Sequence, residues 1–324
     1  MTKAVRVHKH GGPEVLTYED VEVGAPGSGE VRIRQTVVGL NFIDVYYRTG
    51  LYKPPALPFI AGNEAAGVVV AVGPDVTDFH PGDRVAYYAN LGGYAEERII
   101  PAAKLVKLPD HISDEQAAVL MLKGMTAFYL LRKTFKVEPG HRVLIHAAAG
   151  GVGLLACQWA KSLGATVIGT VGSKAKAELA LANGCDHVIL YRDEDFVVRV
   201  KQITDGALCD VVYDSVGKTT FPGSLKCLRR RGLFVSFGNA SGPVPPFPLA
   251  ELNAHGSLYA TRPKLNDYVA THEELLEAAD ALFSAVLSGK LKVQINHAYA
   301  LKDVARAHTD LESRATTGAV ILRP

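Results

Sequence analysis

The fold of this chain is decided by one stretch, His141-Arg-Val-Leu-Ile-His146-Ala-Ala-Ala-Gly150-Gly151-Val-Gly153-Leu-Leu-Ala-Cys-Gln-Trp159-Ala-Lys-Ser-Leu-Gly164. An apolar run at its start leads into a glycine-rich turn, and Gly164 supplies a helix stop at its end. The apolar residues between them have the spacing of one helix face: Val152, Ala156, Trp159, Ala160 and Leu163. Strand, glycine-rich turn and helix in this order are the context that a dinucleotide fingerprint requires.

The glycines of this turn predict a pyrophosphate site. Gly150 and Gly153 would let the backbone approach the ligand and let the helix pack on the strand, with the helix N-terminus facing the phosphate charge. Ala148 stands where the usual pattern has its first glycine, so the motif is imperfect. The flanking strand and helix nevertheless favour a nucleotide site over an ordinary turn.

The next unit indicates which nucleotide binds. The run 165–170 is predicted as the second strand, and an NAD site usually has an acid near the end of that strand. Here no acid occurs before Glu178; Gly172, Ser173 and Lys176 would instead accept a 2′-phosphate at the start of a helix. Tyr191 and Arg192, after a third strand at 187–190, could reach the same end of the adenosine. The alternative is an ordinary solvated helix start, although lysine there opposes the helix dipole.

Two more strands are predicted at 210–214 and 233–237, with a helix from about Lys218. Each strand is followed by small or polar residues, Ser215-Val216-Gly217 and Gly238-Asn239-Ala240-Ser241-Gly242. Ligands of open parallel sheets lie beyond the carboxyl ends of the strands, so these loops are cofactor candidates. The run Arg229-Arg230-Arg231 is interpreted as cations that close a helix before Gly232.

Length and composition agree with a cofactor enzyme of two domains. The chain has 324 residues, of which 48% are hydrophobic and 21% charged, and its net charge of +2 gives no case for nucleic-acid binding. No signal-peptide core or run of transmembrane length is present, so we expect no membrane association. The four cysteines are widely spaced and predict buried free thiols in a reducing compartment, the cytoplasm: Cys157, Cys185, Cys209 and Cys227.

The first 120 residues have a different pattern, of short β-like segments separated by Gly, Pro and Asp turns. These segments predict a partly antiparallel, barrel-like domain, with strands at 4–7, 31–38, 66–72 and 84–88. The tail has strand character at 293–295 and 318–322, with a helix between them, and we expect it to return to this first domain.

A series of short motifs recurs in order along nearly the whole chain. The motifs are Lys9-His-Gly-Gly-Pro-Glu-Val-Leu16, Asn41-Phe-Ile-Asp44, Gly62-Asn-Glu-Ala-Ala-Gly67, Gly82-Asp-Arg-Val85, Lys123-Gly-Met-Thr126, Ala147-Ala-Ala-Gly-Gly-Val-Gly153, Tyr213-Asp-Ser-Val-Gly217 and Leu311-Glu-Ser-Arg314. Single motifs of this kind recur widely, but the ordered set is specific. In this set the chain resembles the zinc-independent quinone oxidoreductases of the medium-chain dehydrogenase/reductase superfamily.

This resemblance implies an α/β fold: a GroES-like, mostly antiparallel β catalytic domain plus a Rossmann domain with a doubly wound parallel sheet. The implied boundaries are 1–123 for the catalytic domain, completed by 262–324, and 124–261 for the Rossmann domain. It also implies NADPH as cofactor and a homodimer. We expect the dimer contact at the sheet edge, near the β-like run Gly256-Ser-Leu-Tyr-Ala260.

The residues that are missing are also informative. Zinc-dependent relatives hold a catalytic metal with a Cys and a His, and the matching positions here are Asn41 and Asn63. Neutral amides are poor zinc ligands beside thiolate and imidazole. The Cys-rich structural zinc loop is absent too, so we expect no metal. A quinone accepts hydride without a Lewis acid, which leaves the protein to place the two rings against each other in a dry slot.

Within the resemblance, the site residues carry over position by position. Asn41, Phe42, Asp44 and Val45 would line the nicotinamide side, and Tyr46, Arg48 and Tyr52 would border the substrate slot, where the tyrosines could stack on a flat ring. Each has an alternative without a role in binding or catalysis. The tyrosines could simply pack at a domain seam, Asp44 could cap a helix, and Glu64 could be a buried structural acid. The remaining cofactor candidates are Thr126, Tyr129, Gly150, Gly151, Val152, Gly153, Gly172, Ser173, Lys176, Tyr191, Ser215, Phe237, Gly238, Ser241, Arg262 and Arg314.

The expected function is therefore NADPH-dependent reduction of a quinone or another small electrophile. One alternative is an NADPH-dependent enoyl or enal reductase on the same fold, which needs a proton donor over the carbon next to the one that accepts hydride. Another is a binding protein that keeps NADPH without turnover, and surface ion pairs are the alternative for Arg262 and Arg314. A structural protein fits least, because residues for both ends of the cofactor are retained.

Overall fold

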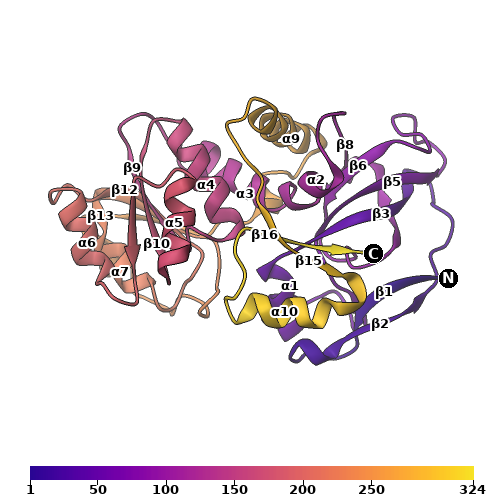
Figure 1. Cartoon of the computed structure of the whole chain (residues 1–324), viewed down its shortest axis with the longest axis horizontal. Helices are drawn as coiled ribbons and strands as arrows, with labels where there is room; N and C mark the ends of the chain where they lie inside the picture. The colour runs from indigo at the N-terminus through magenta and orange to yellow at the C-terminus, as the bar shows by residue number, and fades with distance from the viewer. The chain divides into compact units, whose positions relative to one another are not determined.

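The computed structural model describes all 324 residues, and the chain forms two compact units (Figure 1). The first unit consists of Met1–Met125, Thr271–Leu287 and Val293–Pro324, and the second of Thr126–Ala270 with Ser288–Lys292. The tail strands and the helix between them thus belong to the first unit, as the sequence predicts. None of the helices combines the length and apolar character that a membrane span requires.

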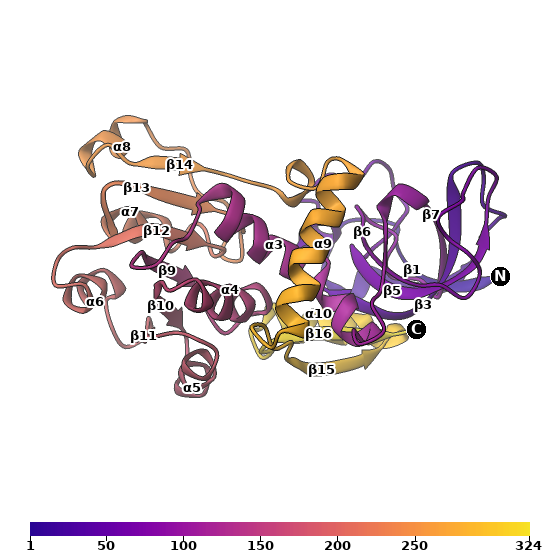
Figure 2. The same cartoon turned by 90° about the horizontal axis from the view of Figure 1, so that it is seen from above.

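The second unit is built on a sheet of six strands, all parallel, in the order β11-β10-β9-β12-β13-β14. Figure 2 shows them in this order from β11 upward to β14. The first strand of the unit, β9, lies inside the sheet, and the order reverses beside it, as in a Rossmann fold. The strands are β9 (Arg142–His146), β10 (Thr166–Val171), β11 (His187–Leu190), β12 (Cys209–Asp214), β13 (Leu228–Ser236) and β14 (Tyr259–Thr261).

Helices cover this sheet as right-handed crossovers require, with α4 and α5 on one face and α6 and α7 on the other. On the latter face, apolar residues of the strands, such as Leu144 and Ile168, pack with Val200 of α6 and Phe221 of α7. The helices are α3 (Lys123–Tyr129), the π-helix η3 (Leu130–Thr134), α4 (Gly151–Ser162), α5 (Lys174–Ala182), α6 (Phe196–Ile203), α7 (Phe221–Lys226) and α8 (Ala250–Ala254). All four cysteines are buried and free, which confirms the prediction of buried free thiols.

The prediction that Arg229-Arg230-Arg231 closes a helix is wrong. Helix α7 has already ended at Lys226, and the three arginines lie in β13. The strand begins early because Leu228 pairs with Cys209 before a register shift, and Arg229 forms an ion pair with Asp210 of β12. The preceding helix also starts at Phe221 rather than near Lys218, with a proline in its first turn, a position that proline favours.

The first unit contains two β-sheets. One has three strands in the order β2-β1-β4, and the other runs β15-β16-β3-β5-β6-β8, with β7 also paired to β3. Every pair is antiparallel except β15 with β16, so the prediction of a mostly antiparallel domain is confirmed. The strands are β1 (Thr2–Val7), β2 (Leu16–Val21), β3 (Glu30–Leu40), β4 (Phe59–Ile60), β5 (Glu64–Val72), β6 (Arg84–Tyr88), β7 (Glu97–Pro101), β8 (Leu105–Lys107), β15 (Ile295–Ala300) and β16 (Ala319–Arg323).

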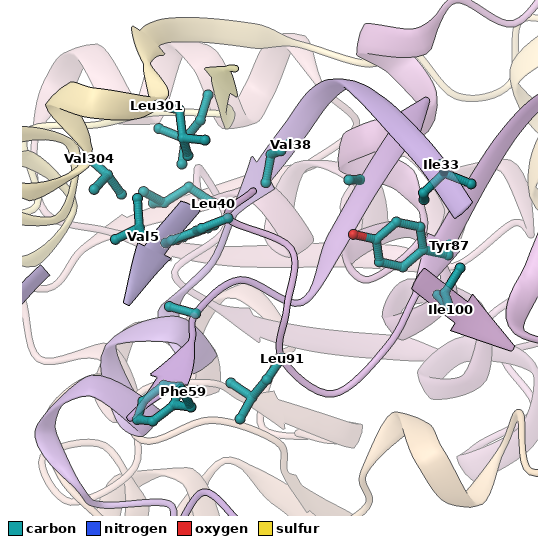
Figure 3. Close-up of a cluster of buried hydrophobic side chains, with 14 of the residues drawn as sticks. Val5, Ile33, Val38, Leu40, Phe59, Tyr87, Leu91, Ile100, Leu301 and Val304 are labelled. Atoms are coloured by element: carbon teal, nitrogen blue, oxygen red, sulfur yellow. The ribbon is translucent and has the colours of Figure 1, made fainter. Parts of the chain in front are cut away.

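The core of the first unit joins residues from both ends of the chain (Figure 3). Val5 and Leu40 from the N-terminal strands lie with Leu301 and Val304 from the tail. Burying each such side chain stabilises the fold by about 1.5–3 kcal/mol, so the tail is an integral part of this unit.

The helices of the first unit are α1 (Phe42–Thr49), α2 (Asp114–Leu120), α9 (His272–Leu287) and α10 (Val304–Glu312).

Candidate cofactor site and polar site

The glycine-rich turn leads into α4, whose N-cap is Gly150. No side chain caps this helix, so the N–H groups of its first turn face the sheet edge without the usual side-chain acceptor. A Cβ on Gly153 would lie 2.3 Å from the Ala147 carbonyl oxygen, which means that only glycine lets the helix pack this close to the turn. An uncapped helix N-terminus at the carboxyl end of a central strand suits a phosphate.

The turn after β10 carries the residues predicted to select the nucleotide. Ser173 caps α5 by accepting a hydrogen bond from the Lys176 backbone N–H at 3.4 Å. The structure also brings Tyr191 to this turn, because a Cβ on Gly172 would lie 2.6 Å from the Tyr191 hydroxyl oxygen and 3.5 Å from Arg192 Nε. Hydroxyl and cationic groups therefore gather here, and no acid lies in the turn or the first part of the helix.

The loops after β12 and β13 are bonded to each other. Ala240 N–H donates to the Ser215 carbonyl oxygen at 3.2 Å, and Ser241 N–H donates to the Val216 carbonyl oxygen at 2.8 Å. Gly238 is required at its position, since a Cβ there would lie 2.4 Å from the Ser215 carbonyl oxygen. Arg262 Nη1 donates to the Ser236 carbonyl oxygen at 2.9 Å, which ties the segment after β14 to the end of β13.

These features of the second unit fit a phosphorylated dinucleotide. The uncapped helix start suits the pyrophosphate, the acid-free turn suits a 2′-phosphate, and the paired loops lie at the same edge of the sheet. Tyr129, one of the predicted cofactor residues, is buried in α3 and stacks on Tyr268, with ring centroids 4.4 Å apart. Thr126 is buried in the same helix.

In the first unit, the start of α1 forms a buried polar cluster. Asn41 is the N-cap, and its backbone N–H donates to Asp44 Oδ2 at 2.8 Å, so the cap role of Asp44 is confirmed. Asn41 Nδ2 donates to Glu64 Oε1 at 2.8 Å. Asn63 Nδ2 donates to Asp44 Oδ1, while Asn63 Oδ1 accepts from the Leu91 backbone N–H. The two amides that the resemblance places at zinc-ligand positions are thus occupied by hydrogen bonds to carboxylates.

Glu64 is fully buried and forms an ion pair with Lys123, with Nζ 2.7 Å from Oε1. Its Oε2 accepts from the Leu122 backbone N–H at 2.6 Å. With an amide, an ammonium and a backbone donor around it, the carboxylate is held in place. Burial and these bonds fit the structural interpretation of Glu64.

A second buried chain reaches Asp44 from the C-terminal helix. Arg48 Nη1 lies 3.0 Å from His308 Nδ1; His308 Nε2 lies 3.0 Å from the Tyr94 hydroxyl, which donates to Asp44 Oδ2 at 2.8 Å. Arginine only donates, so His308 Nδ1 must accept. The imidazole is therefore neutral, and its Nε2–H donates to the Tyr94 hydroxyl oxygen. Burial, together with the charge of Arg48, lowers the pKa of His308 to about 3.

The pKa of Asp44 is raised although three donors bond to its carboxylate. Burial is the largest influence and raises its pKa to about 6, although bonds from Asn63, Tyr94 and the Asn41 backbone oppose this rise. The sequence contains no local signal for Tyr94 or His308, since His308 lies 214 residues from Tyr94 along the chain.

Aromatic residues of α1 and of the loop after it form a group of their own. The Tyr46 and Tyr52 rings lie 5.2 Å apart, edge to face, and Phe42 lies 6.4 Å from Tyr46. Tyr46 and Val45 are buried, whereas Tyr52 is half-buried.

The Arg48 guanidinium, in contrast, is 1% exposed and points to other partners, with Nε on the Gly11 carbonyl oxygen and Nη2 on Glu312 at 2.8 Å. It holds α1 to α10, and contact with a substrate would require breaking these bonds. Arg314 lies exposed just beyond α10. No group of three or more His, Cys, Asp or Glu side chains has the arrangement of a metal site.

The sequence matches two family models, an alcohol dehydrogenase GroES-like domain over residues 27–110 and a zinc-binding dehydrogenase over residues 151–280. A quinone oxidoreductase of Salmonella typhimurium is 55% identical over the full length of both chains. A 2-haloacrylate reductase of a Burkholderia species is 47% identical and covers 100% of this chain and 99% of its own.

Among solved structures, the quinone oxidoreductase of Escherichia coli complexed with NADPH superposes with a TM-score of 0.98 at 52% identity, over 99% of this chain and 100% of that one. Both domains of this chain are therefore those of a medium-chain dehydrogenase/reductase, and the likeness extends over the whole sequence. This chain belongs to the quinone oxidoreductase family of the medium-chain dehydrogenase/reductase superfamily.

Proposed function

We propose that this protein is an NADPH:quinone oxidoreductase that transfers hydride from NADPH to a quinone without a metal ion. The observation that carries the proposal is the turn after β10, where Ser173, Lys176, Tyr191 and Arg192 gather and no acid is present. An acid at this point would bind the ribose hydroxyls of NADH and repel the 2′-phosphate of NADPH. The related Escherichia coli enzyme was crystallised with NADPH, which supports the same cofactor here.

Reduction of a quinone to a hydroquinone takes one hydride, which bound NADPH supplies, and one proton. The chain's own part is to bind the cofactor through the second unit and to hold the quinone in a dry, oriented position. We propose that Asn41, Phe42, Asp44 and Val45 line the nicotinamide side and that Tyr46 and Tyr52 flank the quinone ring. The cofactor residues that we propose beside these are Thr126, Tyr129, Gly150, Gly151, Val152, Gly153, Gly172, Ser173, Lys176, Tyr191, Ser215, Phe237, Gly238, Ser241, Arg262 and Arg314. Arg48 would support the substrate side indirectly, by holding α1 to α10.

We propose residues 1–123, completed by 262–324, as the catalytic domain and 124–261 as the NADPH-binding domain. Four buried free cysteines support a reducing compartment, and the cytoplasm is the location we propose. No feature of the charge distribution favours a nucleic-acid partner over a small-molecule substrate.

Stopped-flow measurement of NADPH oxidation across a panel of quinones and 2-enals tests the proposal. Rapid oxidation with quinones supports it. Turnover with enals alone would favour the second candidate, an enal or acrylate reductase, for which the 47% identical 2-haloacrylate reductase is the specific argument. Tight NADPH binding with no turnover on any electrophile would identify a binding protein instead.

Removal of metal is expected to leave the enzyme unchanged. Asn41 and Asn63 stand at the positions of the usual ligands, and their amides are bonded to Glu64 and Asp44. Exhaustive chelation with EDTA should therefore alter neither quinone turnover nor the melting temperature. Stoichiometric zinc in the purified protein, with activity lost on its removal, would overturn metal independence.

We also propose a homodimer joined through the edge of the parallel sheet. Strand β14 ends the strand order, and Tyr259 on it is 59% exposed. An unpaired edge invites strand addition from a two-fold partner, which satisfies backbone groups of both chains. Proline at position 258 would remove a donor from this edge, but the Leu258 N–H already donates to the Leu252 carbonyl oxygen within the chain. Tyr259 is therefore the better position at which to test the interface.

Tyr259→Glu is expected to convert the dimer to a monomer, because the two-fold axis would bring two like charges together at the interface. Light scattering at micromolar concentration measures the state. Leu181→Glu, on exposed helix α5, is the matched control and should leave the dimer intact. A parent protein that is already monomeric under these conditions would show the interface to be wrong.

A further inference from the structure

Four buried polar side chains lie beneath the carboxyl edge of the parallel sheet, and nothing above assigns them a role. His146 ends β9, Thr170 lies in β10, Asp214 ends β12, and Ser224 lies in α7. Each is at most 2% exposed. Burying a polar group destabilises the fold unless the group is fully hydrogen-bonded. A buried polar cluster that spans three strands and a helix therefore indicates a specific role.

The chemistry of the side chains fixes the direction of their hydrogen bonds. The Asp214 carboxylate only accepts, and Ser224 Oγ donates to its Oδ2 at 2.9 Å. Ser224 Oγ then accepts from His146 Nε2 at 3.0 Å, which leaves His146 Nδ1 to accept from Thr170 Oγ1 at 2.9 Å. A neutral imidazole satisfies both contacts, and burial lowers the pKa of His146, which keeps it neutral.

The other carboxylate oxygen closes the loop that follows β12. Asp214 Oδ1 accepts from the backbone N–H of Val216 at 2.8 Å, from that of Gly217 at 2.9 Å and from Thr220 Oγ1 at 2.9 Å. A carboxylate that accepts from the backbone two and three residues ahead fixes a turn. Gly217 adopts a φ of 90° in this turn, and a Cβ on it would lie 2.4 Å from the Gly242 carbonyl oxygen.

This loop in turn holds the loop after β13. Lys218 N–H donates to the Gly242 carbonyl oxygen at 3.0 Å, in addition to the bonds that join Ser241 to Val216 and Ala240 to Ser215. The Phe237 N–H donates to the Asp214 carbonyl oxygen at 2.8 Å. The Asp214 side chain therefore sets the conformation of residues 215–217 directly. Residues 215–217 and Lys218 in turn hold residues 237–242.

We infer that Asp214 is a positioning residue for NADPH, which holds the loops 215–217 and 237–242 in their binding conformation while His146 and Ser224 hold its carboxylate. The inference rests on the proposed function, because these loops are its cofactor loops. Asp214 is bonded within the protein on both oxygens and acts through the loop backbone, not by contact with the reacting atoms. Its loss should weaken cofactor binding without changing the affinity for the quinone.

Asp214→Ala, Asp214→Asn and Asp210→Ala test this assignment together. Alanine removes every bond, whereas the asparagine oxygen still accepts from the loop N–H groups and Ser224 can turn its hydroxyl to the Thr220 carbonyl oxygen, 3.0 Å away. Asp210 is the matched control, a buried aspartate at the opposite end of the same strand, paired with Arg229. The measurements are NADPH dissociation constants, KM for the quinone, melting temperatures, and hydrogen exchange of the ligand-free loops.

For Asp214→Ala we expect a rise of about tenfold or more in the NADPH dissociation constant, since two or more hydrogen bonds that order the loops are lost. Its loop amides should exchange faster, and KM for the quinone should stay unchanged. Asp214→Asn should recover most of the affinity, and Asp210→Ala should lower the melting temperature without changing NADPH binding.

An unchanged NADPH dissociation constant in Asp214→Ala, or an equal rise in Asp210→Ala, overturns the inference. If Asp214→Ala does not fold, Thr220→Val replaces it, because this isosteric change removes one donor to the carboxylate; it should raise the constant several-fold, and no change would reject the role. A parent protein that binds no NADPH would refute the proposed function itself, whereas faster loop exchange in Asp214→Ala would still measure the positioning role.

Discussion

Replacing Lys123 with methionine is expected to lower the free energy of unfolding by about 3–5 kcal/mol, because it leaves a buried carboxylate without its counter-ion. Glu64 is fully buried and Lys123 is 5% exposed, so solvent cannot take over the charge. Glu64 would keep only the Asn41 amide and the Leu122 N–H as donors. Urea denaturation followed by circular dichroism measures the loss, and hydrogen exchange of β5 should localise it to the first unit.

An exposed lysine provides the matched control. Lys136 lies 3.5 Å from Glu138, and its side chain is 71% exposed, so Lys136→Met should change stability by less than about 1 kcal/mol. The double variant Lys123→Met with Glu64→Gln should recover much of the loss, since it removes the stranded charge. Equal losses from Lys123→Met and Lys136→Met would show that the buried pair has no special role.

The second unit was predictable from the sequence because its information is local. The strand before the glycine-rich turn, the helix after it and the later strands each carry their own apolar pattern. Arg229 shows where local reasoning fails. Three arginines before a glycine are typical of a helix end, but the pairing of Leu228 with Cys209 and the ion pair to Asp210 place them in a strand. A contact between strands overrides the local preference.

The polar networks were not predictable, because they join residues that are far apart in the chain. Arg48 and His308 are 260 residues apart, and His146 and Ser224 are 78 apart. No spacing rule connects such pairs, and each residue taken singly has an ordinary surface explanation. The sequence identified Asn41 and Asn63 as poor metal ligands and Asn41 also as a nicotinamide-side residue, but it did not predict that their amides donate to Glu64 and Asp44.

Lys176→Ala is expected to weaken NADPH binding by about ten- to a hundredfold, because a charge-assisted contact contributes on the order of 1.5–3 kcal/mol. NADH lacks the 2′-phosphate, so its dissociation constant should stay nearly unchanged. Fluorescence titration of both nucleotides measures the two constants in parent and variant. Alanine is a good helix former, and the Lys176 backbone N–H still reaches Ser173, so helix α5 should remain intact.

Lys174→Ala separates a specific contact from general electrostatics. Lys174 is the first residue of the same helix and is exposed, whereas Lys176 is half-buried beside the turn. A general attraction for phosphate would weaken by a similar factor in both variants and would fall steeply with added salt. A direct contact would be lost in Lys176→Ala alone. Equal dissociation constants for NADPH and NADH in the parent would reject the phosphate site, because the acid-free turn would then discriminate nothing.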